Sequence, residues 1–102
     1  MAQVVDCRID QCINDMQRYE EWGNLLAGQC FFNVSTINAP VSVLAIHNGL
    51  EYIKAKMKLV VLQDSSHTKE DKDRRLGQID IDIRQTEDII KRDLEYRRLL
   101  TL

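Results

Sequence analysis

The fold class depends on one stretch, residues 68–100, which runs TKEDKDRRLGQIDIDIRQTEDIIKRDLEYRRLL. Within it, Ile79–Ile83 alternates apolar and acidic residues, as a half-buried strand does. Against this, six acidic residues each precede a basic residue by four positions, a spacing that pairs opposite charges only on a helix. The pairs are Glu70/Arg74, Asp71/Arg75, Asp80/Arg84, Glu87/Lys91, Asp88/Arg92 and Asp93/Arg97. We therefore predict a helix over about residues 68–100.

Two earlier segments carry the apolar spacing of packed helices, in steps of three and four. In residues 2–27 this stripe comprises Val5, Ile9, Cys12, Met16, Tyr19, Gly23 and Leu26. In residues 39–63 it comprises Val43, Ile46, Leu50, Ile53, Met57 and Val60. Asn38 is expected to cap the second helix, with Pro40 in its first turn. Residues 29–38 are expected to form a connector, and a short strand over residues 29–39 is the alternative.

The composition agrees with a helical chain. A single proline and four glycines among 102 residues are too few for an all-β fold with many tight turns. We predict an all-α protein, a three-helix bundle made of a helical hairpin and a long C-terminal helix, with residues 1–102 as one domain. Three cysteines without a secretion signal, and no apolar run long enough for a membrane, favour the cytoplasm.

Apolar residues lie on two sides of the last two helices. Opposite the stripe that contains Ile79, Ile83 and Ile90, the C-terminal helix carries a second apolar set, and the preceding helix does the same. A monomer needs one buried face on each helix, and monomers rarely expose a large apolar patch. We therefore expect a homo-oligomer or a protein partner. The candidate interface comprises Ile81, Ile89, Tyr96, Leu99, Leu100, Tyr52 and Leu59.

No pattern in the sequence indicates catalysis. Cys7 and Cys12 would point about 140° apart on a helix, too far to share one metal ion. His47 and Glu51 have the i, i+4 spacing, which we interpret as a surface hydrogen bond. The metal-binding, nucleophile and phosphate-loop motifs of helical and α/β enzymes are absent from the sequence. We expect no enzyme activity, no catalytic or metal site and no cofactor.

The charge pattern further limits the classes of partner that we expect. The net charge is −2, and acidic residues interleave the basic clusters, so neither a nucleic acid nor a membrane surface is the expected partner. The expected function is a non-enzymatic protein–protein interaction module: an adaptor, an assembly or secretion chaperone, or an inhibitor. The alternatives are a helical oligomer that binds a small anionic ligand, such as a nucleotide, between subunits, and a small transcription regulator.

Overall fold

The computed structural model describes residues 7–28 and 39–102. It contains the helices α1 (Cys7–Gly28), α2 (Val43–Gln63) and α3 (Lys69–Tyr96), with the two-residue strands β1 (Val41–Ser42) and β2 (Leu100–Thr101). The chain is therefore mostly helical, which confirms the predicted all-α class. Ile79–Ile83, the segment with a strand-like alternation, lies inside α3.

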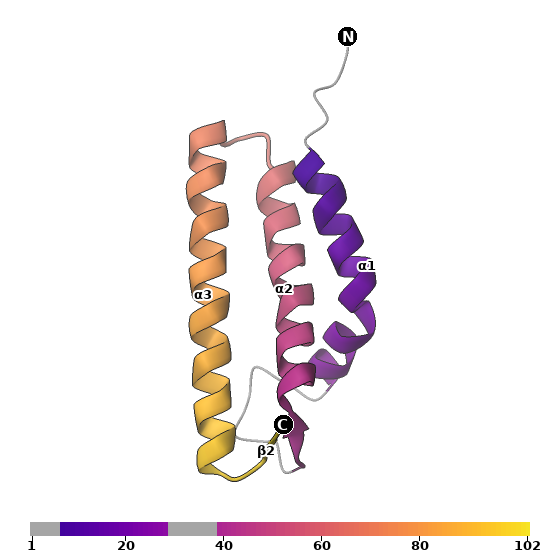
Figure 1. The fold of residues 1–102 in the computed structure, drawn as a ribbon. Coiled ribbons are helices and arrows are strands. Elements are labelled where there is room, and N and C mark those ends of the chain that lie inside the picture. The colour runs from indigo at the N-terminus through magenta and orange to yellow at the C-terminus, as the bar shows by residue number, and fades with distance from the viewer. Residues whose placement is uncertain (1–6, 29–38) are drawn as a thin grey trace.

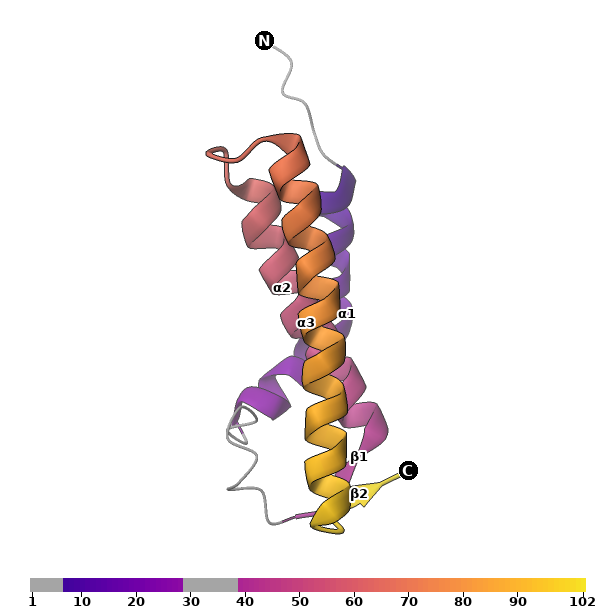
Figure 2. The same cartoon turned by 90° about the vertical axis from the view of Figure 1, so that its left-hand side faces the viewer.

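Helix α2 lies between the other two helices and contacts both (Figure 1). Seen from the side of α3, α1 crosses behind α2 and α3 at an angle (Figure 2). At the N-terminal end of α1, Arg8 reaches α3, where its Nη1 lies 2.6 Å from Oδ1 of Asp73. The position of this crossing determines which parts of α2 are buried against α1 and which remain exposed to solvent.

The turn between α2 and α3 is built from polar side chains, as the cluster Asp64–His67 suggests. Ser66 donates both its backbone N–H and its hydroxyl to Oδ1 of Asp64, at 2.9 and 2.6 Å. The hydroxyl of Thr68 then accepts from the N–H of Asp71 at 3.2 Å and caps α3, whose expected start near residue 68 is thus found. Lys72 donates from Nζ to the carbonyl of Leu62 at 3.0 Å and satisfies the end of α2.

The start of α2 differs from the prediction. The helix begins at Val43, and its cap is Ser42, whose hydroxyl accepts from the N–H of Ala45 at 3.1 Å. Pro40 precedes the helix because the backbone of Val41 is engaged elsewhere: its N–H donates to the carbonyl of Leu99 at 2.7 Å. Val41 and Ser42 pair in parallel with Leu100 and Thr101. Asn38, the expected cap, and the connector 29–38 lie outside the described residues.

The end of α3 also differs, and the predicted helix to Leu100 is wrong. Arg98 adopts a left-handed conformation with φ of 56°, and α3 stops at Tyr96. The N–H of Leu99 donates to the carbonyl of Leu94 at 2.7 Å, and that of Arg98 to Glu95 at 2.9 Å. This is the bonding of a Schellman motif, which ends a helix and reverses the chain.

The main core lies at the end of the molecule where the two strands pair. Its buried residues come from β1, α2 and α3, and they are Val41, Ala45, Ile46, Leu50, Ile90 and Leu94. Trp22 of α1 and the half-buried Leu99 and Leu100 pack against this cluster. The apolar stripes of α2 and α3 are therefore buried together at this end.

Candidate protein-binding groove

The C-terminal half of α2 carries an apolar surface that no described element covers. Met57 and Val60 continue the stripe of Ile46 and Leu50, yet their exposed fractions are 41% and 66%, whereas Ile46 and Leu50 are fully buried. Helix α1 packs on a different side of this half, where Ile13 and Met16 line a pocket with Tyr52 and Leu59. The stripe of α2 is thus longer than the surface that its neighbours bury.

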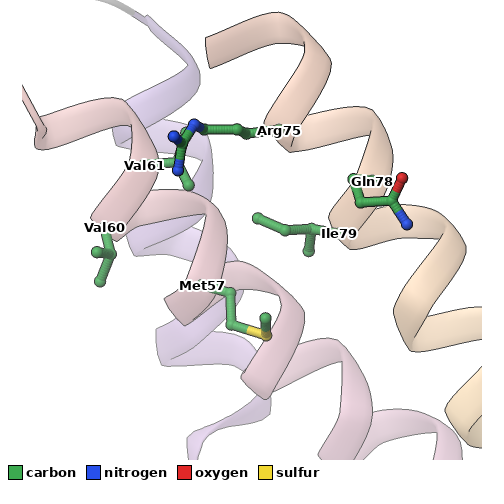
Figure 3. Close-up of a pocket in the computed structure, with 6 residues that line it drawn as sticks. All are labelled: Met57, Val60, Val61, Arg75, Gln78 and Ile79. Carbon is green, nitrogen blue, oxygen red and sulfur yellow. The ribbon is translucent and has the colours of Figure 1, made fainter. Parts of the chain in front are cut away.

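A groove of about 390 Å³ lies between α2 and α3 at this end. Met57, Val60 and Val61 of α2 line it together with Arg75, Gln78 and Ile79 of α3 (Figure 3). Figure 3 shows Ile79 extending from α3 toward α2 and the Met57 thioether lying below it. Ile79 is buried, so it forms part of the floor, while Met57 and Val60 remain open to solvent.

The rim of the groove is positively charged. The Arg75 side chain extends across the groove toward Val61 (Figure 3), and its Nε lies 3.8 Å from Oδ2 of Asp71. That carboxylate also binds Arg74 and lies 3.0 Å from Nδ1 of His67. Because this one carboxylate is shared by two guanidinium groups and the His67 ring, the half-exposed guanidinium of Arg75 is only partly neutralised.

A second surface between α2 and α3 is polar and carries internal ion pairs. His47 Nδ1 lies 3.0 Å from Oε1 of Glu87, and Lys58 Nζ lies 2.6 Å from Oδ1 of Asp80. Burial raises the pKa of Glu87, but the hydrogen bonds and positive charges of Lys91 and His47 more than offset it, so its pKa is below the usual value. This surface is stabilised within the monomer, unlike the groove.

The predicted helix charge pairs are found in part. Three of the six lie within 4 Å: Asp71/Arg75, Glu87/Lys91 at 3.0 Å and Asp93/Arg97 at 3.6 Å. Asp80 binds Lys58 of α2 instead of Arg84. The expected partner of His47, Glu51, is 4.0 Å away, farther than Glu87 of α3. The i, i+4 spacing compares residues within one helix, so it could not predict these two ion pairs between α2 and α3.

The predicted interface residues fall into three groups. Ile81, Ile89 and Tyr96 lie on α3 with exposed fractions of 52%, 64% and 88%. Leu99 and Leu100 do not share this helix face, because the chain turns back at Arg98 and packs both against the core. Tyr52 and Leu59 are half-buried beside α1, so they contribute to a contact within the monomer.

Sequence reasoning did not identify the groove. Met57 and Val60 belong to the stripe that was expected to be buried, and nothing in their spacing differs from that of Ile46 and Leu50. Their exposure depends on where α1 crosses α2, which helix periodicity does not encode. Of the aromatic residues, Trp22 packs on the core and Tyr52 on Gly23, so both have a packing role.

A metal-binding cluster and a membrane-spanning helix are both absent from residues 7–28 and 39–102. Within those ranges, the side chains of His, Cys, Asp and Glu form no cluster of three or more that could hold a metal ion. Over the same ranges, none of the helices combines the length and the apolar character needed to cross a bilayer.

Comparisons with protein-family models, curated proteins and solved structures find no match for this chain.

Proposed function

We propose that this chain is a non-enzymatic interaction module that binds an amphipathic helix of a partner protein in the groove between α2 and α3. The observation that supports this proposal is the exposure of Met57 and Val60 beside an apolar floor of Val61 and Ile79. Burying a large aliphatic side chain stabilises a complex by roughly 1.5–3 kcal/mol. A partner that covers both residues would therefore gain a substantial part of its affinity here.

A helix is the secondary structure that suits this groove best. The walls are two neighbouring helices, and a third helix can lay an apolar face between them with residues at i, i+3, i+4 and i+7. The volume, about 390 Å³, is at the lower end of the range of roughly 300–1,000 Å³ found for ligand sites, which fits a few side chains. Met57 adds an adaptable surface, because its unbranched thioether can fill gaps of different shape.

The positive charge at one end of the groove determines the orientation in which a partner helix binds. Arg75 lies at the end of the groove next to the α2–α3 turn, and its half-exposed guanidinium can bind a carboxylate through two hydrogen bonds. An acidic residue at the matching end of the bound helix would satisfy it. We therefore propose a partner helix with an apolar face and an Asp or Glu at one end.

The lining of the groove supports binding without catalysis. Among the described residues that line it, the only charged side chain is Arg75, whose guanidinium donates hydrogen bonds and has no acceptor atom. The other lining groups are aliphatic side chains, a thioether and the amide of Gln78. These groups supply contact area and hydrogen bonds, and they include no nucleophile.

The proposal is tested by selecting binders from a display library of helical peptides against the full chain and against two variants. Val60→Asp places a charge in the groove. Leu44→Asp is the matched control, since the exposed fraction of Leu44 on α2 is 59%, close to the 66% of Val60, and Leu44 does not line the groove. We expect enriched peptides with an apolar face and a terminal acid, losing at least about tenfold in affinity for Val60→Asp. Peptides that bind Val60→Asp as well as the unchanged chain would contradict the proposal.

A further inference from the structure

Helix α3 presents a second apolar feature, separate from the groove. Ile81, Ile89 and Tyr96 are its three most exposed large apolar residues, and they fall within an arc of about 80° at 100° per residue. Gln85 and Arg92 occupy the intervening turns, so Ile81, Gln85, Ile89, Arg92 and Tyr96 form one line, here called the outer stripe. The outer stripe lies opposite the buried Ile79, Ile90 and Leu94. Because Ile90 and Leu94 pack in one cluster with residues of α2, the outer stripe faces away from α2.

The charges beside the outer stripe differ from those nearer to α2. Asp80 and Glu87 form ion pairs with Lys58 and Lys91 within the monomer. Arg84, Asp88 and Glu95 form no ion pair with any residue in the described part of the chain. Positive and negative side chains without an ion pair therefore flank the exposed outer stripe. Helices that pack against each other in a coiled coil show this pattern of an apolar line flanked by charges.

We propose that a second copy of this chain packs on the outer stripe, with the two α3 helices antiparallel and Gln85 on the two-fold axis. In that register Ile81 of each copy packs against Ile89 of the other, so the same contact forms twice and covers both exposed isoleucines of each copy. The proposal does not rest on the groove, because its apolar contacts come from a different side of α3.

The charges favour this register and orientation. Arg84 lies on the same flank of the outer stripe as Asp88, and antiparallel packing brings Arg84 of each copy beside Asp88 of the other. The same register brings Glu95 of one copy near Arg74 of the other, and Arg74 is itself exposed on α3. A parallel pair in register would instead set Arg92 against its own copy in the centre of the seam, where like charges repel.

The association is tested by sedimentation velocity over a concentration series that spans the micromolar range. The unchanged chain is expected to shift from monomer to dimer, Ile89→Asp to stay monomeric, and Val60→Asp, as the matched control on α2, to behave like the unchanged chain. A chain that is monomeric throughout, or an Ile89→Asp variant that still dimerises, would overturn the proposal. Because Val60 belongs only to the groove, failure of one proposal leaves the other intact.

Orientation and register are tested separately. Arg84→Asp alone and Asp88→Arg alone are each expected to weaken the dimer, and the double variant to restore it, since the pair is re-formed with reversed signs. Mixing Gln78→Cys with Arg92→Cys under mild oxidation should give mainly the mixed disulfide between positions 78 and 92, identified by peptide mass spectrometry. Disulfides formed mainly between like positions, or a double variant that stays monomeric, would overturn the antiparallel arrangement.

Discussion

The aromatic ring of Tyr52 in α2 lies directly against the backbone of Gly23 in α1. A Cβ atom at Gly23 would overlap ring carbons of Tyr52, so no larger residue fits there unless one of the helices moves. Gly23 is buried inside a helix, where glycine is about 1 kcal/mol less favourable than alanine. The close approach of α1 and α2 therefore depends on the absence of a side chain at this position.

Replacing Gly23 with alanine is expected to destabilise the protein. Overpacking of a well-packed contact costs about 1–3 kcal/mol, and the gain in helix propensity, about 1 kcal/mol, offsets only part of it. We expect a lower free energy of unfolding for Gly23→Ala, measured by urea denaturation followed by circular dichroism. Tyr52→Leu in the Gly23→Ala background should recover part of the loss, because the smaller side chain can move away from the new methyl group.

Gly77→Ala is the matched control for helix propensity. Gly77 is exposed on α3, and a Cβ atom there would meet no heavy atom within 4 Å. The same substitution is thus expected to raise the free energy of unfolding by up to about 1 kcal/mol. Opposite signs at positions 23 and 77 would locate the effect in the α1–α2 contact, and a stabilising Gly23→Ala would show that this contact is looser than the structure indicates.

The core and the groove are expected to respond differently to truncation. Leu94 is fully buried in the cluster near the strands, so Leu94→Ala should lower the free energy of unfolding by about 2–5 kcal/mol. Val60→Ala, on the exposed edge of the groove, should change it by no more than about 0.5 kcal/mol. Chemical denaturation of both variants checks this, and a large loss for Val60→Ala would mean that the groove is part of the core.

The helical class and the existence of each helix could be predicted from the sequence, because local periodicity encodes them. The charge spacing in residues 68–100 favoured a helix over a strand at Ile79–Ile83, and this prediction is confirmed because the segment lies inside α3. The exposure of Met57 and Val60 could not be predicted, since it depends on how far α1 covers α2. For the same reason, the pairs Lys58–Asp80 and His47–Glu87 become visible only once α2 and α3 are placed side by side.

The end of α3 was missed for a local reason. The residue that follows a helix in a Schellman motif adopts a left-handed conformation and is usually glycine, but here it is Arg98. No glycine or proline marks the end, and the leucines at positions 99 and 100 continue an apolar pattern. Leu99 then packs on the same core as Leu94, which compensates for the unfavourable conformation of Arg98.

Arg98→Gly is accordingly expected to stabilise the protein. A non-glycine residue in the left-handed region is disfavoured by about 1–2 kcal/mol, which glycine avoids, although its greater freedom when unfolded returns part of the gain. We expect a higher melting temperature by differential scanning calorimetry. Arg92→Gly, the same substitution inside α3, should lower it, because glycine costs about 1 kcal/mol in a helix interior. Equal losses at both positions would contradict the left-handed turn at Arg98.

Glu87 joins α2 and α3 and makes their packing sensitive to acid. Burial raises the pKa of its carboxyl, but the hydrogen bonds and charges of Lys91 and His47 outweigh burial and leave the pKa below 4.5. A carboxyl with a lower pKa when folded than when unfolded stabilises the folded state most when it is ionised. Its contribution is therefore fully present above about pH 4.5 and is lost as the pH falls toward the lowered pKa of the folded protein.

Glu87→Gln is expected to remove this pH-dependent contribution. The melting temperature of the unchanged chain should exceed that of Glu87→Gln near about pH 6. The difference should shrink as the pH falls below about 4.5 toward the lowered pKa of the folded protein. Glu95→Gln, measured where the chain is monomeric, is the control for losing one carboxylate from the same helix, because Glu95 is exposed and forms no ion pair with the described residues of its own chain. A Glu87→Gln difference that does not change with pH would mean that the carboxylate charge adds nothing to the α2–α3 contact.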